Sequence, residues 1–366
     1  MSIMLPRELI TEILSRLPVK SLHRFRCVSK PFRNEIDSRN FVNYHLSQLL
    51  NTNLSHVFND LDIINTFELE SLDDNPMTRE SDISIDPLGF CNGLLYFLPT
   101  TSLYQKTPKI VLFNPTTREH RILHDSGLKK KFHRINYCYG FGYGSVTEDY
   151  KVVMICSSNK RLINRSNKIL IMLYSFKLSC WMIVENDYIP FSFWVQHNSA
   201  PFISSNIHFR VTPKSIINTT MNHMAIAGFD LADEQFNFVP LPMISGETRF
   251  NMAVLRGCLC VTSSWCGTIN HDIWILKEYE VNQSWTKLLS IRLISANVPR
   301  GSWETNCPAF IPIAYSKNGD RVLLKFCRPS YGRRLCWYDL IEKEFGFTKV
   351  LRELTHLFSG NVITNI

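Results

Sequence analysis

Two histidines and a neighbouring aspartate form the first candidate for chemistry in this sequence. His120 and His124 are four residues apart, and Asp125 follows directly. On a helix this spacing places both imidazoles on one face, where they could hold zinc. The flanking residues instead indicate a strand and a turn, in which the two side chains share no fixed face. We therefore expect packed or solvated histidines and no bound metal.

Alternating glycines form the second candidate, at Gly140-x-Gly142-x-Gly144. They lack the G-x-G-x-x-G spacing of a dinucleotide-binding loop, and no helix follows that could offer its N-terminus to a phosphate. Between strands, such glycines mark bulges or a close approach of another chain segment. The pattern predicts a structural role.

Eleven cysteines are present, with no C-x-x-C pair. Cys258, Cys260 and Cys266 are close in sequence, but a structural zinc site normally takes two paired ligand sets. We expect reduced thiols in the core, since free cysteine is among the most buried residue types.

Short basic runs could contact an acidic target or act as nuclear-import signals. They are Lys129-Lys130-Lys131-Phe132-His133-Arg134, Lys160-Arg161 and Arg333-Arg334. Such runs are usually solvated loops, which is our prediction here. No Ser, His and Asp order and no pair of carboxylates compels catalysis, so we expect no catalytic residue and no cofactor.

The elements that position these residues follow from length and composition. With 366 residues the chain exceeds one typical domain, and its 12% aromatic content favours strands. No apolar run approaches the roughly 20 residues of a membrane span, and the N-terminus lacks the pattern of a signal peptide. We expect a soluble protein of the cytoplasm, the nucleus or both, with no membrane partner.

Residues 5–50 predict short helices. An apolar stripe is formed by Leu5, Leu9, Ile10, Ile13, Leu14 and Leu17. Pro18 ends this helix, two short helices follow, and Asn40 is placed to cap a fourth segment. About 45 residues cannot bury so many apolar side chains alone. The excess must cover the rest of this chain or another protein.

The same residues resemble the plant F-box. The resemblance rests on Leu5-Pro6, on Leu17-Pro18-Val19-Lys20-Ser21-Leu22 and on Phe25-Arg26-Cys27-Val28-Ser29-Lys30. It implies that the module docks on the small S-phase-kinase-associated linker subunit, which joins a cullin scaffold. The residues implied to form or brace the docking face are Leu5, Pro6, Ile10, Leu14, Leu17, Pro18, Val19 and Leu22. Charges at Leu14 and Leu17 are then expected to abolish docking.

One position departs from the family pattern. Phe32 precedes Arg33 where the F-box usually has Trp. Phenylalanine keeps most of the ring area but lacks the indole N–H, so docking weakens at most. The alternative for the whole module is a helical cap on its own domain.

An internal repeat marks residues 51–366. An aromatic residue is followed seven positions later by another aromatic or a histidine, with turn-forming residues between them. The copies are Phe113 to His120, Tyr174 to Trp181, Phe229 to Phe236 and Tyr338 to Phe345, with a shorter fifth copy from Tyr279 to Trp285. Each predicts strand, turn, strand, and the period fits propeller blades of roughly 40–50 residues.

We therefore expect a small all-α module at residues 1–50 and an all-β domain at 51–366. A six-bladed kelch-like propeller, closed by strands from both ends of the domain, is our prediction; an irregular β-sandwich is the alternative. The domain lacks the Gly-Gly pair of kelch blades. It resembles the plant F-box-associated domain more closely, through Gly89–Leu95, Phe113–Arg118 and Gly140–Val153.

The two resemblances imply a non-catalytic receptor of a ubiquitin ligase that binds a target protein through the β domain. Trp, Tyr and Arg are enriched at binding hot spots, and loop residues of these types are Trp265, Trp303, Tyr331 and Arg334. Each Trp could equally be a core residue. The competing functions are a propeller enzyme or carbohydrate-binding protein and, from the net charge of +8 alone, a nucleic-acid binder, which we do not expect.

Overall fold

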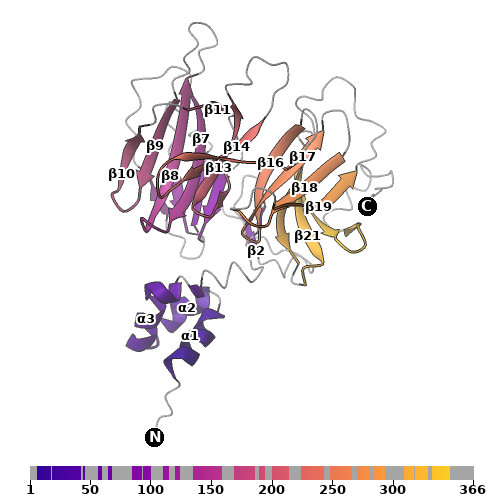
Figure 1. The fold of residues 1–366 in the computed structure, drawn as a ribbon. Helices are drawn as coiled ribbons and strands as arrows, with labels where there is room; N and C mark the ends of the chain where they lie inside the picture. The colour runs from indigo at the N-terminus through magenta and orange to yellow at the C-terminus, as the bar shows by residue number, and fades with distance from the viewer. Residues whose placement is uncertain are drawn as a thin grey trace.

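The structure is a computed structural model, and it describes most of both predicted regions. The described residues are 6–17, 19–42, 44–45, 57–59, 65–67, 85–92, 94–99, 110–114, 120–123, 135–158, 169–185, 189–193, 200–213, 224–242, 248–265, 270–279, 284–292, 309–316, 318–328 and 332–346. Helices come first and strands follow (Figure 1).

Three helices form the N-terminal module: α1 (Arg7–Ser15), α2 (Val19–Phe25) and α3 (Lys30–Ile36). A further helical turn follows, and Ser38 caps it by accepting a hydrogen bond from Phe41 N at 3.2 Å, so the predicted cap at Asn40 is wrong. Ser29 caps α3 in the same way. None of the described helices is long and apolar enough to span a membrane.

The β region consists of antiparallel sheets whose strands follow chain order. A two-stranded ribbon comes first, with β1 (Val57–Asn59) and β2 (Asn65–Phe67). The first four-stranded sheet has β3 (Ile85–Cys91), β4 (Leu94–Pro99), β5 (Val111–Phe113) and β6 (His120–Ile122). The next has β7 (Ile135–Gly144), β8 (Asp149–Ser158), β9 (Ile169–Ser175) and β10 (Cys180–Val184).

Three more sheets follow along the chain. The third has β11 (Phe191–Phe193), β12 (Phe202–Ile203), β13 (Asn206–Pro213), β14 (Ala225–Asp230) and β15 (Phe236–Val239). The fourth has β16 (Thr248–Leu255), β17 (Cys258–Trp265), β18 (Asn270–Leu276) and β19 (Trp285–Arg292). The fifth has β20 (Ala309–Tyr315), β21 (Arg321–Arg328), β22 (Gly332–Asp339) and β23 (Phe345–Gly346).

The predicted repeat is confirmed in four of its five copies. The first and last residues of the spacing lie opposite each other on adjacent strands at Phe113/His120, Tyr174/Trp181, Phe229/Phe236 and Tyr338/Phe345. In the last three pairs the rings meet edge to face, with centroids 4.9–5.3 Å apart. The fifth copy is wrong, because Trp285 pairs with Leu276 and Tyr279 lies in the connection between β18 and β19.

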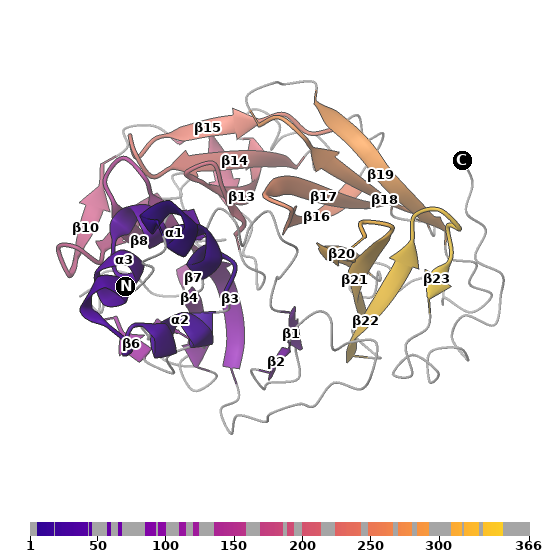
Figure 2. The ribbon, with the colours of Figure 1, turned by 90° about the horizontal axis from the view of Figure 1, so that it is seen from below.

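Successive sheets pack face to face around a ring. Each main hydrophobic cluster draws its residues from two neighbouring sheets: Phe141 and Tyr96 meet between the first and second, Phe229 and Leu173 between the second and third, and Val322 and Ile291 between the fourth and fifth. Figure 2 shows the sheets in chain order around the molecule, with β1 and β2 between β3 and β22. This is a propeller, and the β-sandwich alternative is wrong.

Gly140 and Gly142, two of the three alternating glycines, are confirmed as positions of close approach. A Cβ at Gly140 would meet Ile207, and one at Gly142 would meet Phe202, both from the neighbouring sheet. The β7–β8 ladder passes these residues without a register shift, so neither marks a bulge.

The propeller has two different faces. The near face carries the tight turns at residues 145–148, 176–179, 204–205, 231–235, 256–257 and 340–344. The far face is the opposite end of the strands, where β8 ends and β9 begins. The helical module lies against the near face, below β7–β10 (Figure 1).

Candidate functional site

Large apolar side chains of α1 are exposed on the exterior of the helical module. Leu9 is 50% exposed and Ile13 is 52% exposed. Residues four apart lie on one face of a helix, so the two side chains are neighbours. Phe25 at the end of α2 and Val28 after it are also exposed. Exposure of several large apolar side chains on one small module is typical of a binding surface.

The interior of the module holds two residues predicted for the docking face. Leu14 is 2% exposed and Leu22 is 5% exposed, and they form a core with Ile36 and Phe41. They can brace a docking face but cannot contact a partner. A charge at Leu14 would therefore enter the module's own core and act on docking indirectly, and the expected loss of docking stays a prediction.

The other predicted docking residues fall in three groups. Ile10 and Leu17 are partly buried against the module core, so their outer edges remain accessible. Pro6 is exposed and precedes α1. Val19 begins α2, while its side chain and the whole of Leu5 and Pro18 lie outside what the structure describes.

Polar contacts fix α1 against α3 and the last helical turn. Glu35 accepts hydrogen bonds from Arg7 and Thr11, both at 2.8 Å. Glu12 accepts from Tyr44 at 2.8 Å and pairs with Arg16. The hydrogen bond from Arg16 lowers the pKa of Glu12, with the Tyr44 hydroxyl adding to the effect. The exposed Leu9–Ile13 pair thus lies on a rigid helix.

Sequence reasoning missed one buried polar residue of the module. His45 Nε2 lies 3.0 Å from the carbonyl oxygen of Leu17, and its ring stacks on Phe41. This contact holds the final turn over the end of α1. The only available signal was that Phe41 and His45 are four residues apart.

The four predicted target-binding residues belong to the far face or to connections that join far-face strand ends. Trp265 is the last residue of β17 and Arg334 lies near the start of β22. Their side chains are outside the described set, as are the whole of Trp303 and Tyr331. In sequence, Trp303 lies between β19 and β20, and Tyr331 lies between β21 and β22. The strand order therefore brings Trp265 and Arg334 to the end of the propeller opposite the helices.

Family comparison covers almost the whole chain. Residues 3–44 match the F-box domain, and residues 43–335 match the F-box associated beta propeller domain. The chain belongs to the F-box proteins with a C-terminal F-box-associated propeller. Two Arabidopsis thaliana relatives agree. F-box protein CPR1 is 28% identical over 94% of this chain and 84% of its own length. F-box/kelch-repeat protein At3g23880 is 29% identical over 78% of this chain and 79% of its own length.

Solved structures give only distant likenesses to this F-box protein. The β-propeller domain of the Trilobed protease from Pyrococcus furiosus aligns with 78% of this chain and 88% of that chain, at 10% identity and a TM-score of 0.38. A likeness at that level does not inform on function.

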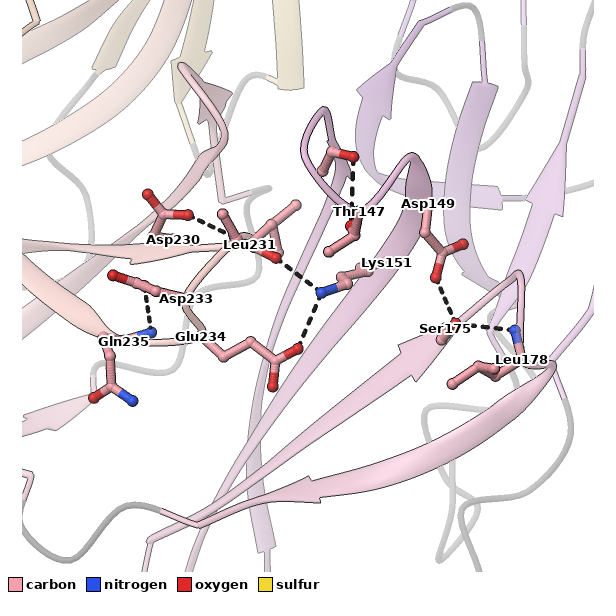
Figure 3. A network of polar contacts seen from close by, with 12 residues as sticks. Thr147, Asp149, Lys151, Ser175, Leu178, Asp230, Leu231, Asp233, Glu234 and Gln235 are labelled. Carbon is pink, nitrogen blue, oxygen red and sulfur yellow. Dashed lines mark hydrogen bonds and ion pairs between the residues drawn. The ribbon is translucent and has the colours of Figure 1, made fainter.

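A buried lysine joins two sheets of the F-box protein at its near face (Figure 3). Lys151 on β8 donates to the carbonyl oxygen of Leu231 at 2.8 Å and to Glu234 Oε1 at 3.0 Å, both in the β14–β15 turn. Beside it, Asp149 accepts hydrogen bonds from Ser175 and from Lys177 N. Because these groups satisfy one another, the Asp149-Tyr150-Lys151 motif holds turns in place.

The remaining candidates for chemistry are structural where they are described. His120 is exposed on β6 opposite Phe113, and His124 lies outside the described set. Across the described ranges, no three His, Cys, Asp or Glu side chains gather as metal ligands would. Cys91, Cys138, Cys156, Cys260 and Cys336 are buried free thiols as predicted. Cys27 and Cys180 are exposed, which corrects the expectation that all thiols lie in the core.

Proposed function

We propose that this F-box protein is the substrate-recognition subunit of an SCF ubiquitin ligase. The helical module docks on the S-phase-kinase-associated linker subunit and through it on a cullin, and the propeller binds the target protein. The observation that carries the proposal is the exposed Leu9–Ile13 pair on α1 of a module that matches the F-box. The complex would work in the cytoplasm, the nucleus or both.

The contribution of this chain is proximity rather than bond chemistry. Holding a target lysine close to the loaded conjugating enzyme turns a bimolecular encounter into an effectively intramolecular one. The ligase chemistry then belongs to other subunits, and the chain needs no cofactor or metal. Membrane and nucleic acid have no place in this mechanism.

The far face is the proposed target surface. Trp265, Trp303, Tyr331 and Arg334 are the candidate contacts, and two observations support them. The near face is partly occupied by the helical module, and the described ends of β17 and β22 lie on the opposite face. Replacement of all four by alanine is expected to remove target capture, and unchanged capture would refute this assignment.

The propeller is proposed to have six blades within a domain of residues 51–366. Five sheets have four or more strands, and the β1–β2 ribbon lies in the interval between the first and the last of them. That ribbon is the start of the sixth blade, and C-terminal residues 361–366 are candidates to complete it. Completion of this blade by strands from both ends of the domain would close the ring and leave only short, protected sheet edges.

Linker binding tests the main proposal. Leu9→Asp/Ile13→Asp puts two charges on the exposed face and is expected to weaken binding of the purified linker by on the order of 100-fold or more, at about 1.4 kcal/mol per tenfold. The control Ile183→Asp/Ile341→Asp changes two exposed apolar residues of the propeller and should bind normally. Failure of the unmodified chain to bind the linker would contradict the proposal.

A further inference from the structure

One charged pair connects the helical module to the near face of the propeller. Arg39, in the helical turn after α3, meets Glu148 in the turn between β7 and β8. The contact is bidentate: Nη1 pairs with Oε2, and Nη2 pairs with Oε1. End-on, two-point pairing of guanidinium and carboxylate adds orientation to attraction, because both hydrogen bonds form only when the two planes align.

Both partners are held in place before they meet. On the module side, Phe41 is 2% exposed in the core and its N–H is capped by Ser38, so the turn that carries Arg39 cannot rotate freely. On the propeller side, Glu148 has a φ of +55° in a tight turn between two ten-residue strands. The pair therefore joins two turns whose backbones are each held by their own domain.

Among the described residues, apolar packing does not explain the position of the module. Val146, in the same turn as Glu148, is 76% exposed, and Leu178 in the adjacent β9–β10 turn is 62% exposed. If hydrophobic contact held the module, these two turn tips would be covered. The groups around the contact instead favour the charged forms of Arg39 and Glu148. Glu148 and Tyr143 both raise the pKa of Arg39, Glu148 first, and Arg39 followed by Lys177 lowers the pKa of Glu148.

We propose that Arg39 and Glu148 form a latch that fixes the angle between the helical module and the propeller. The inference rests on the proposed function, since this angle sets where the far face points relative to the linker. Arg39 and Glu148 are positioning residues that do not contact the target. Both side chains are about half exposed, so salt screens the pair and the latch loosens as ionic strength rises.

The chain offers its own labelling sites for a test. Cys27 on the module and Cys180 on β10 are exposed free thiols. With Cys258, Cys266, Cys307 and Cys327 replaced by serine, spin labels at Cys27 and Cys180 report the distance between the two bodies by pulsed electron resonance. We expect a narrow distribution at low salt that broadens in Arg39→Glu and at high salt.

Two variants make the test specific. The double reversal Arg39→Glu/Glu148→Arg restores opposite charges and is expected to narrow the distribution again, with some residual width from repulsion by Lys177. Lys30→Glu makes the same change in net charge at an exposed residue of α3 and should leave the distribution narrow. A narrow distribution in Arg39→Glu, or a double reversal as broad as the single one, would overturn the proposal.

Linker binding separates this inference from the proposed function. The Leu9–Ile13 pair lies on α1 and makes no contact with Glu148, so Arg39→Glu is expected to bind the linker as well as the unmodified chain does. If the unmodified chain fails to bind the linker but the distance distributions behave as expected, the latch stands and the ligase function fails. If binding is normal and Arg39→Glu leaves the distribution unchanged, only the latch fails.

Discussion

Two buried histidines should make the propeller sensitive to mild acid. His208 on β13 is fully buried and has one partner on each ring nitrogen: the carbonyl oxygen of Pro201 lies 3.0 Å from Nδ1, and the hydroxyl of Tyr279 lies 2.7 Å from Nε2. The carbonyl can only accept, so Nδ1 carries the proton and Nε2 accepts from Tyr279. Burial lowers the pKa of His208 from 6.5 to about 4. Burial also lowers the pKa of His271, again to about 4.

The sign of the pH effect follows from these values. Between pH 6.5 and 4 the unfolded chain binds protons at His208 and His271 that the folded chain does not. Falling pH therefore favours unfolding. The free energy of unfolding has its full value above pH 6.5 and declines as the pH falls toward 4. At pH 5 the protonation of each histidine in the unfolded chain is expected to have lowered the free energy of unfolding by about 2 kcal/mol. That pH is still above the range in which the paired carboxylates titrate.

Urea unfolding at intervals between pH 7 and pH 5 measures this decline. The readout is the slope of the free energy of unfolding against pH, which does not depend on how much a substitution destabilises the protein overall. His208→Gln keeps a donor and an acceptor without titrating, and His271→Phe suits the ring contact with Phe310. Each should remove about half of the slope. If both single variants keep the full slope, the assignment of neutral buried histidines is refuted.

Three further predictions concern stability and are checked by thermal or urea unfolding. Tyr174→Ala deletes a fully buried ring that packs edge-on against Trp181 and is expected to cost about 3–5 kcal/mol; a loss near zero would contradict the role of the repeat. Gly142→Ala drives a Cβ into Phe202 and should destabilise by about 1–3 kcal/mol, whereas a stabilising effect would show that the two sheets can separate freely. Lys151→Met leaves Leu231 O and Glu234 without their donor and should cost about 1–3 kcal/mol, and an unchanged midpoint would show that water replaces the ammonium group.

The repeat could be predicted because its spacing reflects a local rule. Residues seven apart across a tight turn lie opposite each other, so Tyr174 and Trp181, like Phe229 and Phe236, identify their hairpins without any knowledge of the rest of the chain. The prediction failed at Tyr279 for the same reason. The connection between Leu276 and Trp285 is two residues longer, and an aromatic residue inside that connection imitates the start of a copy.

The helical stripe shows the limit of periodicity. Leu9, Ile13 and Leu14 all fit one wide apolar face, yet only Leu14 is buried. The difference comes from α3 and the final turn, because Ile36 and Phe41 pack over one edge of α1 and leave the other edge open. A spacing rule cannot tell these edges apart. The Arg39–Glu148 pair was invisible for a related reason, since it joins two turns more than a hundred residues apart.

The near-face turns of the propeller are tight, and this bears on function. In the described part of the propeller, every residue with a left-handed backbone lies in a near-face turn, among them Glu148, Glu234, Arg256 and Lys343. Such turns are tight, and Asp339 secures one of them by accepting from two backbone N–H groups. A face built in this way tolerates little change.

The far-face connections are known here by their lengths, since most of their residues lie outside the described part of the chain. A short one, residues 329–331, joins β21 to β22, and a long one, residues 293–308, joins β19 to β20. Because loop closure costs little extra free energy per added residue, such connections can change length and composition while the sheets stay the same. The receptor that we propose would present one constant end to the linker and a changeable end to its target, and this division would supply both. The docking helices lie against the constant end, which is why we place target recognition on the opposite face.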